Sequence, residues 1–115
     1  MTHELKIALA QLNPTVGDVA GNVALLRKAR ATAAEKGADL VLYSELVLSG
    51  YPPEDLVLKP AFQQACKSAL QELAADTPDG GPAMLVGAPW LEGDKLHNGL
   101  FLLAEGKIAA SRFKH

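Results

Sequence analysis

One helical stretch between two apolar runs dominates the first 44 residues and limits the folds that this chain can adopt. Residues 5–12 alternate as a β-strand does, so that Leu5, Ile7 and Leu9 share one face. Residues 39–44 are almost continuously apolar, which is typical of a strand buried on both faces. Together with the helix between them, these runs predict a β-α-β unit with parallel strands and a right-handed crossover.

The intervening helix is expected to begin at Asp18 or Asn22 and to end at Lys36, because apolar residues recur there at helical spacing. Gly37 follows the last turn, at a position that favours a positive φ. Three cationic residues are expected to lie largely on the polar side of this helix: Arg27, Lys28 and Arg30.

The rest of the sequence predicts a second helix and three more strands, and hence an α/β sheet protein. The helix starts near Lys59, and its apolar positions form the clearest amphipathic pattern in the chain. Residues 76–82 are expected to form a surface loop. The predicted strands cover residues 83–88, 96–104 and 107–114, and the last two are joined by a hairpin turn at Glu105-Gly106.

Composition narrows the class of protein. The chain has 115 residues, of which 49% are hydrophobic and 21% charged, as in soluble globular domains. Its formal net charge of −2 and its lack of basic runs argue against a nucleic-acid partner or a membrane-surface patch. No apolar stretch is long enough to predict a transmembrane helix, and the first residues lack the features of a secretory signal. The single cysteine favours a reducing, cytoplasmic setting.

Two helices can cover only part of a five-stranded sheet. Because large exposed apolar patches are unusual in monomers, we expect further chain or a partner to cover the rest.

Glu45 is the first candidate for chemistry. It lies at the carboxyl end of a predicted buried strand, where open α/β sheets place their ligands. Partial desolvation there would raise the pKa of a carboxylate and make it a usable base. The alternative is that Glu45 ends its strand in water.

Lys114 and Cys66 are the next candidates. Lys114 can stabilise a developing oxyanion if a carboxylate faces it, or it can be a solvated strand-end lysine. Cys66 lies within the second helix among apolar residues, so we interpret it as a buried hydrophobe and not a nucleophile.

Other features predict no further site. Asn98-Gly99 is compatible with a turn. No second histidine or acid stands at metal-ligand spacing from His97, so no metal site is predicted. No glycine-rich phosphate loop is present, so no cofactor is expected in these residues.

Several segments carry a resemblance to a known family. Residues 44–56, SELVLSGYPPEDL, resemble the glutamate motif of the nitrilase (carbon–nitrogen hydrolase) superfamily. Within them, GYPPEDL is similar to the version found in glutamine-dependent NAD⁺ synthetases. The opening LKIALAQLNPTVGD of residues 5–18 looks like the same family. The final GKIAASRFKH of residues 106–115 looks like the approach to the family's catalytic lysine.

This resemblance implies the α-β-β-α sandwich of the superfamily, with residues 1–115 as a first, partial carbon–nitrogen hydrolase (glutaminase) domain. It implies that Glu45 is the general base, that Lys114 stabilises the oxyanion and that Tyr51 lines the glutamine pocket. The family's nucleophilic cysteine follows the lysine at a distance, and Cys66 does not match it. By resemblance, the 115 residues alone would therefore be inactive.

The resemblance also implies a function. Glutamine amide hydrolysis would supply ammonia for the ATP-dependent amidation of deamido-NAD⁺ to NAD⁺. Glutamine is then the substrate, and a carboxyl-terminal synthetase domain of the same chain, which uses ATP and Mg²⁺, is the partner. A homo-oligomer is also expected. No residue of that synthetase domain occurs in the sequence.

Two alternatives stay open at this point. The first is a stand-alone nitrilase-superfamily amidase, such as an ω-amidase or carbamoylase, which shares the triad but lacks the synthetase half. The second is a non-catalytic α/β interaction domain in which Glu45 and Lys114 are surface charges.

Overall fold

The order of helices and strands follows the prediction. The computed structural model describes residues 4–44, 47–48, 59–92 and 95–114. The elements are β1 (Ile7–Leu9), α1 (Val19–Glu35), β2 (Leu40–Leu42), α2 (Pro60–Asp76), the short 3₁₀ helix η2 (Thr77–Asp79), β3 (Ala83–Glu92), β4 (Lys95–Ala104) and β5 (Lys107–Lys114). Neither described helix is long and apolar enough to cross a membrane.

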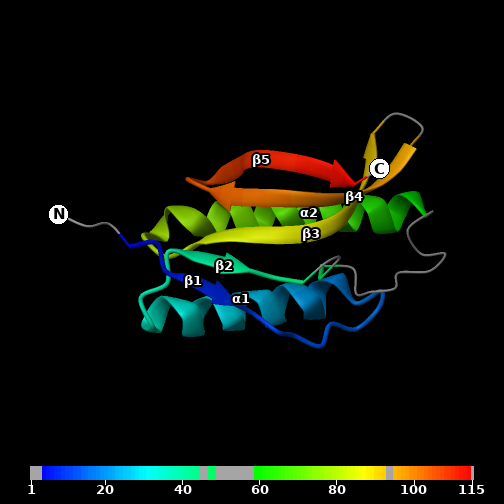
Figure 1. The fold of residues 1–115 in the computed structure, drawn as a ribbon. Helices are drawn as coiled ribbons and strands as arrows, with labels where there is room; N and C mark the ends of the chain where they lie inside the picture. The colour runs from blue at the N-terminus through cyan, green and yellow to red at the C-terminus, as the bar shows by residue number, and fades with distance from the viewer. Residues whose placement is uncertain (1–3, 45–46, 49–58, 93–94, 115) are drawn as a thin grey trace.

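The strands form one sheet in the order β1-β2-β3-β4-β5. β1, β2 and β3 are parallel, because a helix returns the chain between each pair, whereas β3, β4 and β5 form an antiparallel meander. Two right-handed crossovers that advance in the same direction place both helices on one face of the sheet (Figure 1). The salt bridge between Arg27 and Asp76, 2.8 Å long, joins α1 to α2 on that side.

The core lies between this face and the helices. Ala8, Val41, Met84 and Leu103 pair across neighbouring strands, so their side chains share the face that packs against α1 and α2. The three larger members of this row are fully buried. The helices supply Val23, Leu26, Cys66, Leu70 and Leu73 to the same core.

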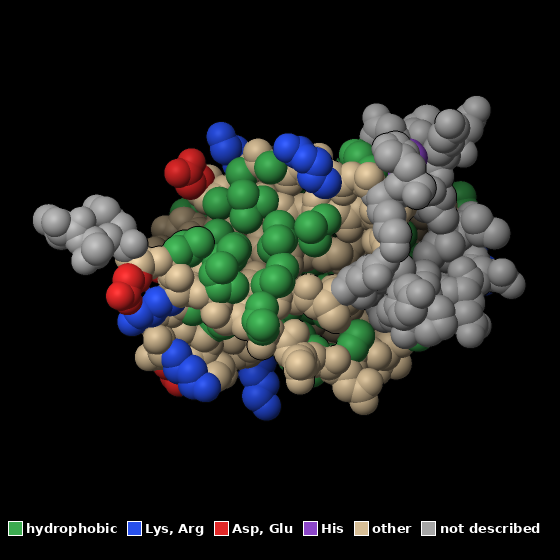
Figure 2. Space-filling view, in the orientation of Figure 1, with side chains coloured by type: hydrophobic (Ala, Val, Ile, Leu, Met, Phe, Trp, Pro, Cys, Tyr) green, Lys and Arg blue, Asp and Glu red, His purple; other side chains and the backbone are tan. Residues whose placement is uncertain are grey.

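The other face of the sheet is apolar and open. Ile7 and Leu9 alternate with Ala8 in β1 and share one face, as predicted. These two residues are 50% and 71% exposed, and Leu5, before β1, is 68% exposed. Hydrophobic side chains gather over the strands on this face (Figure 2). No described residue covers it. The predicted sandwich requires such a face, because its two sheets pack together through apolar sides.

Two predicted turns are confirmed. Gly37, after α1, has a φ of 78°. Glu105 and Gly106 have φ values of 54° and 79°, which is the backbone of a type I′ hairpin turn. The pairing of β4 with β5 then shifts register between Leu102 and Leu103, because β5 carries one extra residue there.

The position predicted for Arg30 is wrong. Its side chain is buried, because its guanidinium donates hydrogen bonds to the Asp79 carboxylate at 2.8 and 2.9 Å and to the Pro82 carbonyl at 2.9 Å. The hydrogen bonds that Arg30 donates to Asp79 raise the pKa of Arg30, so the buried guanidinium stays charged. Residues 76–82 lie at the surface, as predicted, with residues 78–81 exposed. The segment contains η2, and Arg30 anchors it to α1.

Candidate functional site

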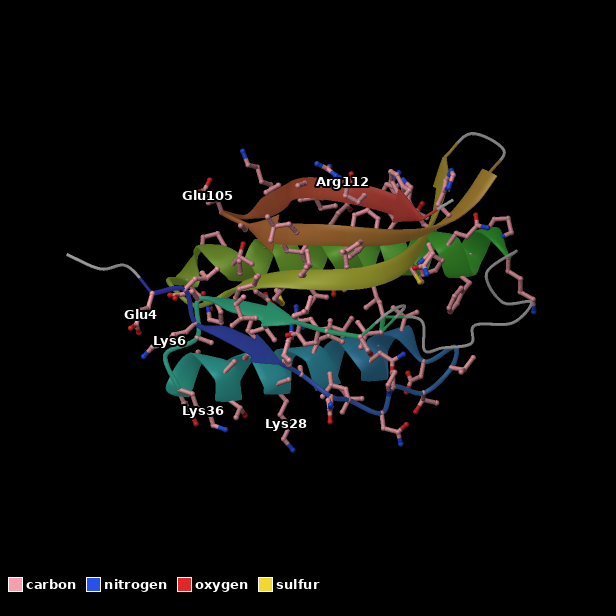
Figure 3. The ribbon with its side chains drawn as sticks, in the orientation of Figure 1. Glu4, Lys6, Lys28, Lys36, Glu105 and Arg112 are labelled. Carbon is pink, nitrogen blue, oxygen red and sulfur yellow. The ribbon has the colours of Figure 1, made fainter. Side chains whose placement is uncertain are left out.

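The carboxyl end of β2 and the end of β5 border one open hollow. Its volume is about 460 Å³, and it includes the carboxyl end of β2, where the candidate base Glu45 was predicted to lie. The residues that line it are Leu42, Tyr43, Gly87, Asn98, Gly99, Leu100, Arg112 and Phe113. Among these described lining residues, Arg112 alone carries a full charge. Its side chain projects from β5, whereas Lys28 and Lys36 project from the outer side of α1 (Figure 3).

Of the three predicted site residues, only Lys114 belongs to the part of the chain that the structure describes. Glu45 and Tyr51 lie outside the described residues. Lys114 is the last residue of β5, and its main chain pairs with Asn98 of β4. The hollow is therefore bordered by Tyr43, two residues before Glu45, and by Phe113, next to Lys114.

The main chain is fixed on both sides of residues 45 and 46. Before them, the Tyr43 N–H donates to the Leu85 carbonyl at 3.2 Å. After them, the Leu48 N–H donates to the Gly87 carbonyl at 3.3 Å. The chain thus leaves β2 beside β3 and returns to β3 two residues further along, a distance of roughly 7 Å in a strand. Val47 and Leu48 are fully buried, so this return is anchored by packing as well.

Tyr43 also ties this end of β2 to α1. Its hydroxyl donates a hydrogen bond of 2.9 Å to the Leu26 carbonyl, and its side chain is buried. Burial raises the pKa of the Tyr43 phenol, so it remains a neutral donor at any physiological pH.

An aromatic cluster supports the end of β5 from the helix side. The Phe101 ring lies 5.0 Å from Trp90 and 6.0 Å from Phe113, measured between centroids. Gly99 makes room for it, because a Cβ at that position would lie 2.7 Å from the Phe101 ring. Phe113 is thereby held directly before Lys114.

Cys66 is unsuited to nucleophilic chemistry, as predicted. Its side chain is fully buried in α2, and burial raises the pKa of its thiol to about 11. The thiolate fraction at neutral pH is therefore negligible.

Metal ligands are not gathered in the part of the chain that the structure describes: no group of three or more His, Cys, Asp or Glu side chains could hold an ion there. His97 lies in β4 with its ring 5.3 Å from that of Phe113. Asn98-Gly99 lies inside β4 and forms no turn.

Comparison with known proteins identifies the family. Residues 6–115 match the model of the carbon–nitrogen hydrolases. The chain belongs to this family. The predicted superfamily is thereby confirmed, on a match that spans almost the whole sequence.

Relatives with curated names include glutamine-dependent NAD⁺ synthetases. The chain is 42% identical to the one from Rhodobacter capsulatus over 115 residues, which are 100% of this chain and 21% of that protein. It is 40% identical to the one from Aquifex aeolicus over 111 residues, 96% of this chain and 19% of that protein. The chain thus spans about a fifth of the length of these relatives.

Solved structures confirm the nitrilase-type α/β fold. The glutamine-dependent NAD⁺ synthetase from Acinetobacter baumannii superposes with a TM-score of 0.88 at 28% identity, over 96% of this chain and 21% of that one. An amidase from Nesterenkonia sp. superposes with a TM-score of 0.78 at 30% identity, over 96% of this chain and 42% of that one. Another structure of that amidase carries an acetamide moiety bound covalently at its active-site cysteine.

Proposed function

We propose that this chain forms part of the glutaminase domain of a glutamine-dependent NAD⁺ synthetase. The observation that carries the proposal is the similarity to such synthetases along the whole chain, at 42% identity. The hollow beside β2 and β5 supports the proposal, because two of its lining residues, Tyr43 and Phe113, come two residues before Glu45 and one residue before Lys114.

The proposed reaction is acyl transfer from the glutamine side-chain amide. Glu45 takes the proton of a cysteine thiol, and the thiolate attacks the amide carbon. Lys114 stabilises the oxyanion of the tetrahedral intermediate. Glu45 returns the proton to the departing ammonia, and water then cleaves the thioester to release glutamate. Tyr51 contacts the bound glutamine.

The thiol in this mechanism is not that of Cys66, whose burial and raised pKa exclude it. We assign the nucleophile to a cysteine outside these 115 residues. In the Nesterenkonia amidase, an active-site cysteine is the position of covalent addition.

The synthetase half of the proposal concerns residues beyond this sequence. There, ammonia would amidate deamido-NAD⁺ with ATP and Mg²⁺, in a carboxyl-terminal domain of the same chain and within a homo-oligomer. No described residue of this chain fits a metal site, and none is assigned to Mg²⁺ or ATP.

A stand-alone amidase is the second candidate, because the Nesterenkonia amidase also matches 96% of the chain. ATP-dependent amidation of deamido-NAD⁺ separates the two. The full-length protein should catalyse it with glutamine or with free ammonia as the nitrogen source. Amide hydrolysis without any such synthesis would identify the stand-alone amidase instead.

The site is tested by Glu45→Gln and Lys114→Ala in the full-length protein. Each should lower glutamine-dependent synthesis at least about 100-fold, because each removes a group that acts in the transition state. Ammonia-dependent synthesis should be unchanged. Glu72→Gln and Lys107→Ala, which alter exposed residues of α2 and β5, are the matched controls. Glutamine-dependent rates within a few-fold of wild type for both site variants would refute the assignment.

A further inference from the structure

Asn22, in the first turns of α1, is a buried polar residue that the proposed chemistry does not use. The residue is only 1% exposed. It makes three hydrogen bonds: its Oδ1 accepts from the Thr15 N–H at 2.8 Å, and its Nδ2 donates to the Thr15 carbonyl at 2.9 Å and to the Leu48 carbonyl at 3.0 Å. Both amide hydrogens and the amide oxygen are thus engaged away from water.

The partners of Asn22 are main-chain groups of two different loops. Thr15 precedes α1, and Leu48 follows the candidate base by three residues. Neither residue belongs to a helix or a strand, and the Thr15 carbonyl also accepts from the Asp18 N–H at 3.1 Å. Asn22 thus supplies these loop residues with partners that a regular ladder would otherwise provide. A carboxamide is suited to this position, because it offers two donors and an acceptor in a fixed plane.

The Leu48 peptide is therefore held from two directions. Its N–H donates to the Gly87 carbonyl of β3, and its carbonyl accepts from Asn22 of α1. On the other side of Glu45, the Tyr43 hydroxyl donates to the Leu26 carbonyl of the same helix. α1 thus fastens the chain both before and after the candidate general base.

We propose that Asn22 is a positioning residue for Glu45, which acts by fixing the Leu48 carbonyl and hence the chain that carries the carboxylate. The inference rests on the proposed function, in which Glu45 is the general base. Asn22 itself touches no reacting atom in this scheme. A displacement of a catalytic group by about 1 Å can lower a rate about 100-fold, so loss of this tether should be visible in turnover.

Asn22→Asp in the full-length protein is the principal test. It keeps the size of the side chain and an acceptor for Thr15, but it removes the donors and turns a carboxylate toward the Thr15 and Leu48 carbonyls. We expect kcat for glutamine hydrolysis to fall about 10- to 100-fold, with KM for glutamine changed less than about 3-fold. Ammonia-dependent synthesis should stay at the wild-type level.

Thr77→Val is the matched control. It also removes a buried side-chain donor and acceptor, since the Thr77 hydroxyl donates to the Ala74 carbonyl at 2.6 Å and accepts from the Gly106 N–H at 2.8 Å. These groups lie near the β4–β5 turn, at the opposite end of the sheet (Figure 1). This variant should lose thermal stability and retain glutamine turnover.

A double-mutant cycle with Glu45→Gln separates positioning from a general structural role. If Asn22 acts through Glu45, Asn22→Asp should change the residual rate of the Glu45→Gln protein less than about 2-fold. Full additivity of the two losses would overturn the proposal, as would an Asn22→Asp rate within 2-fold of wild type.

Two further outcomes are decisive. If Asn22→Asp does not fold, Asn22→Ser, which keeps one donor in a smaller side chain, is judged by the same criteria. Failure of both variants to yield folded protein would show that Asn22 serves the whole fold, and would overturn the proposal. A Glu45→Gln protein with wild-type glutamine turnover would refute the proposed function itself.

Discussion

Arg30 of α1 and Asp79 of η2 are joined by two parallel hydrogen bonds of 2.8 and 2.9 Å, although 49 residues separate them in the sequence. The guanidinium is buried, whereas the Asp79 side chain is 55% exposed. The Asp79 carboxylate also accepts from the Gly81 N–H at 2.8 Å. The hydrogen bond from Arg30, with help from Gly81, lowers the pKa of Asp79 to about 2. This pair anchors the turn that leads into β3.

The first prediction concerns acid stability. Because the pKa of Asp79 is lower in the folded protein than its ordinary value of 3.8, ionised Asp79 stabilises the fold above about pH 4. That contribution is lost as the pH falls through about 2. Asp79→Asn should therefore unfold at a lower temperature than wild type at pH 7, and the gap should narrow between pH 4 and pH 2. Thermal unfolding monitored by circular dichroism measures this, and Glu72→Gln should follow wild type throughout. A gap of equal size at pH 7 and pH 2 would contradict the linkage.

The second prediction concerns Cys66. Its thiol is fully buried and has a pKa of about 11, so iodoacetamide at pH 7.5 should not modify it in the folded protein. Mass spectrometry of peptides should find the label at Cys66 only after unfolding in guanidinium. Cys66→Ala should leave glutamine turnover within a few-fold of wild type and lower the free energy of unfolding by about 1 kcal/mol. Loss of turnover in a stable Cys66→Ala protein would show that this cysteine has a chemical role after all.

The third prediction concerns Gly99. An added methyl group would meet the Phe101 ring at 2.7 Å and the Ala88 carbonyl at 3.3 Å. Phe101 is almost fully buried between two other rings and has little room to move. Gly99→Ala should therefore lower the free energy of unfolding by roughly 1–3 kcal/mol, measured by urea titration. Combining it with Phe101→Leu should recover part of the loss, and strictly additive losses would show that the two positions are not in conflict.

Most of the fold could be predicted because its signals are local. The β-α-β unit, Gly37 and the hairpin at Glu105-Gly106 each follow from the spacing or backbone preference of a few adjacent residues, and the structure confirms them. Local signals do not say which face of a strand the helices cover. Ala8 packs inward from β1 while Ile7 and Leu9 point outward, contrary to what their sizes alone suggest.

The end of β3 shows a second limit. The strand was predicted to stop at Ala88, but it continues through Pro89 to Glu92. Proline is acceptable here because the Leu85 and Gly87 carbonyls point toward β2, so the Pro89 nitrogen points to the same side, where β2 has already ended. Among the described residues, no neighbouring strand requires a hydrogen bond from position 89.

The supports of the candidate site were the least predictable part. Asn22 bonds to the main chain of Thr15 and Leu48, 7 and 26 residues away, and Tyr43 bonds to that of Leu26, 17 residues away. Such pairs produce no periodic pattern in the sequence. The one available signal was a polar residue, Asn22, among the inward-facing positions of α1. A similar signal was missed at Arg30, whose partner lies across the fold.

The extra residue in β5 makes the end of this strand sensitive to insertions and deletions. Beyond the register shift, Arg112 pairs with Leu100 on the open face, and Phe113 pairs with Gly99 on the helix face. Deleting one residue at the shift would exchange these two orientations, driving a guanidinium into the aromatic cluster and a phenyl ring into the hollow. Length is therefore as strict a requirement as side-chain identity between Lys107 and Lys114. A substitution there changes one side chain, whereas an insertion or deletion of one residue moves every following side chain of β5 to the opposite face of the sheet.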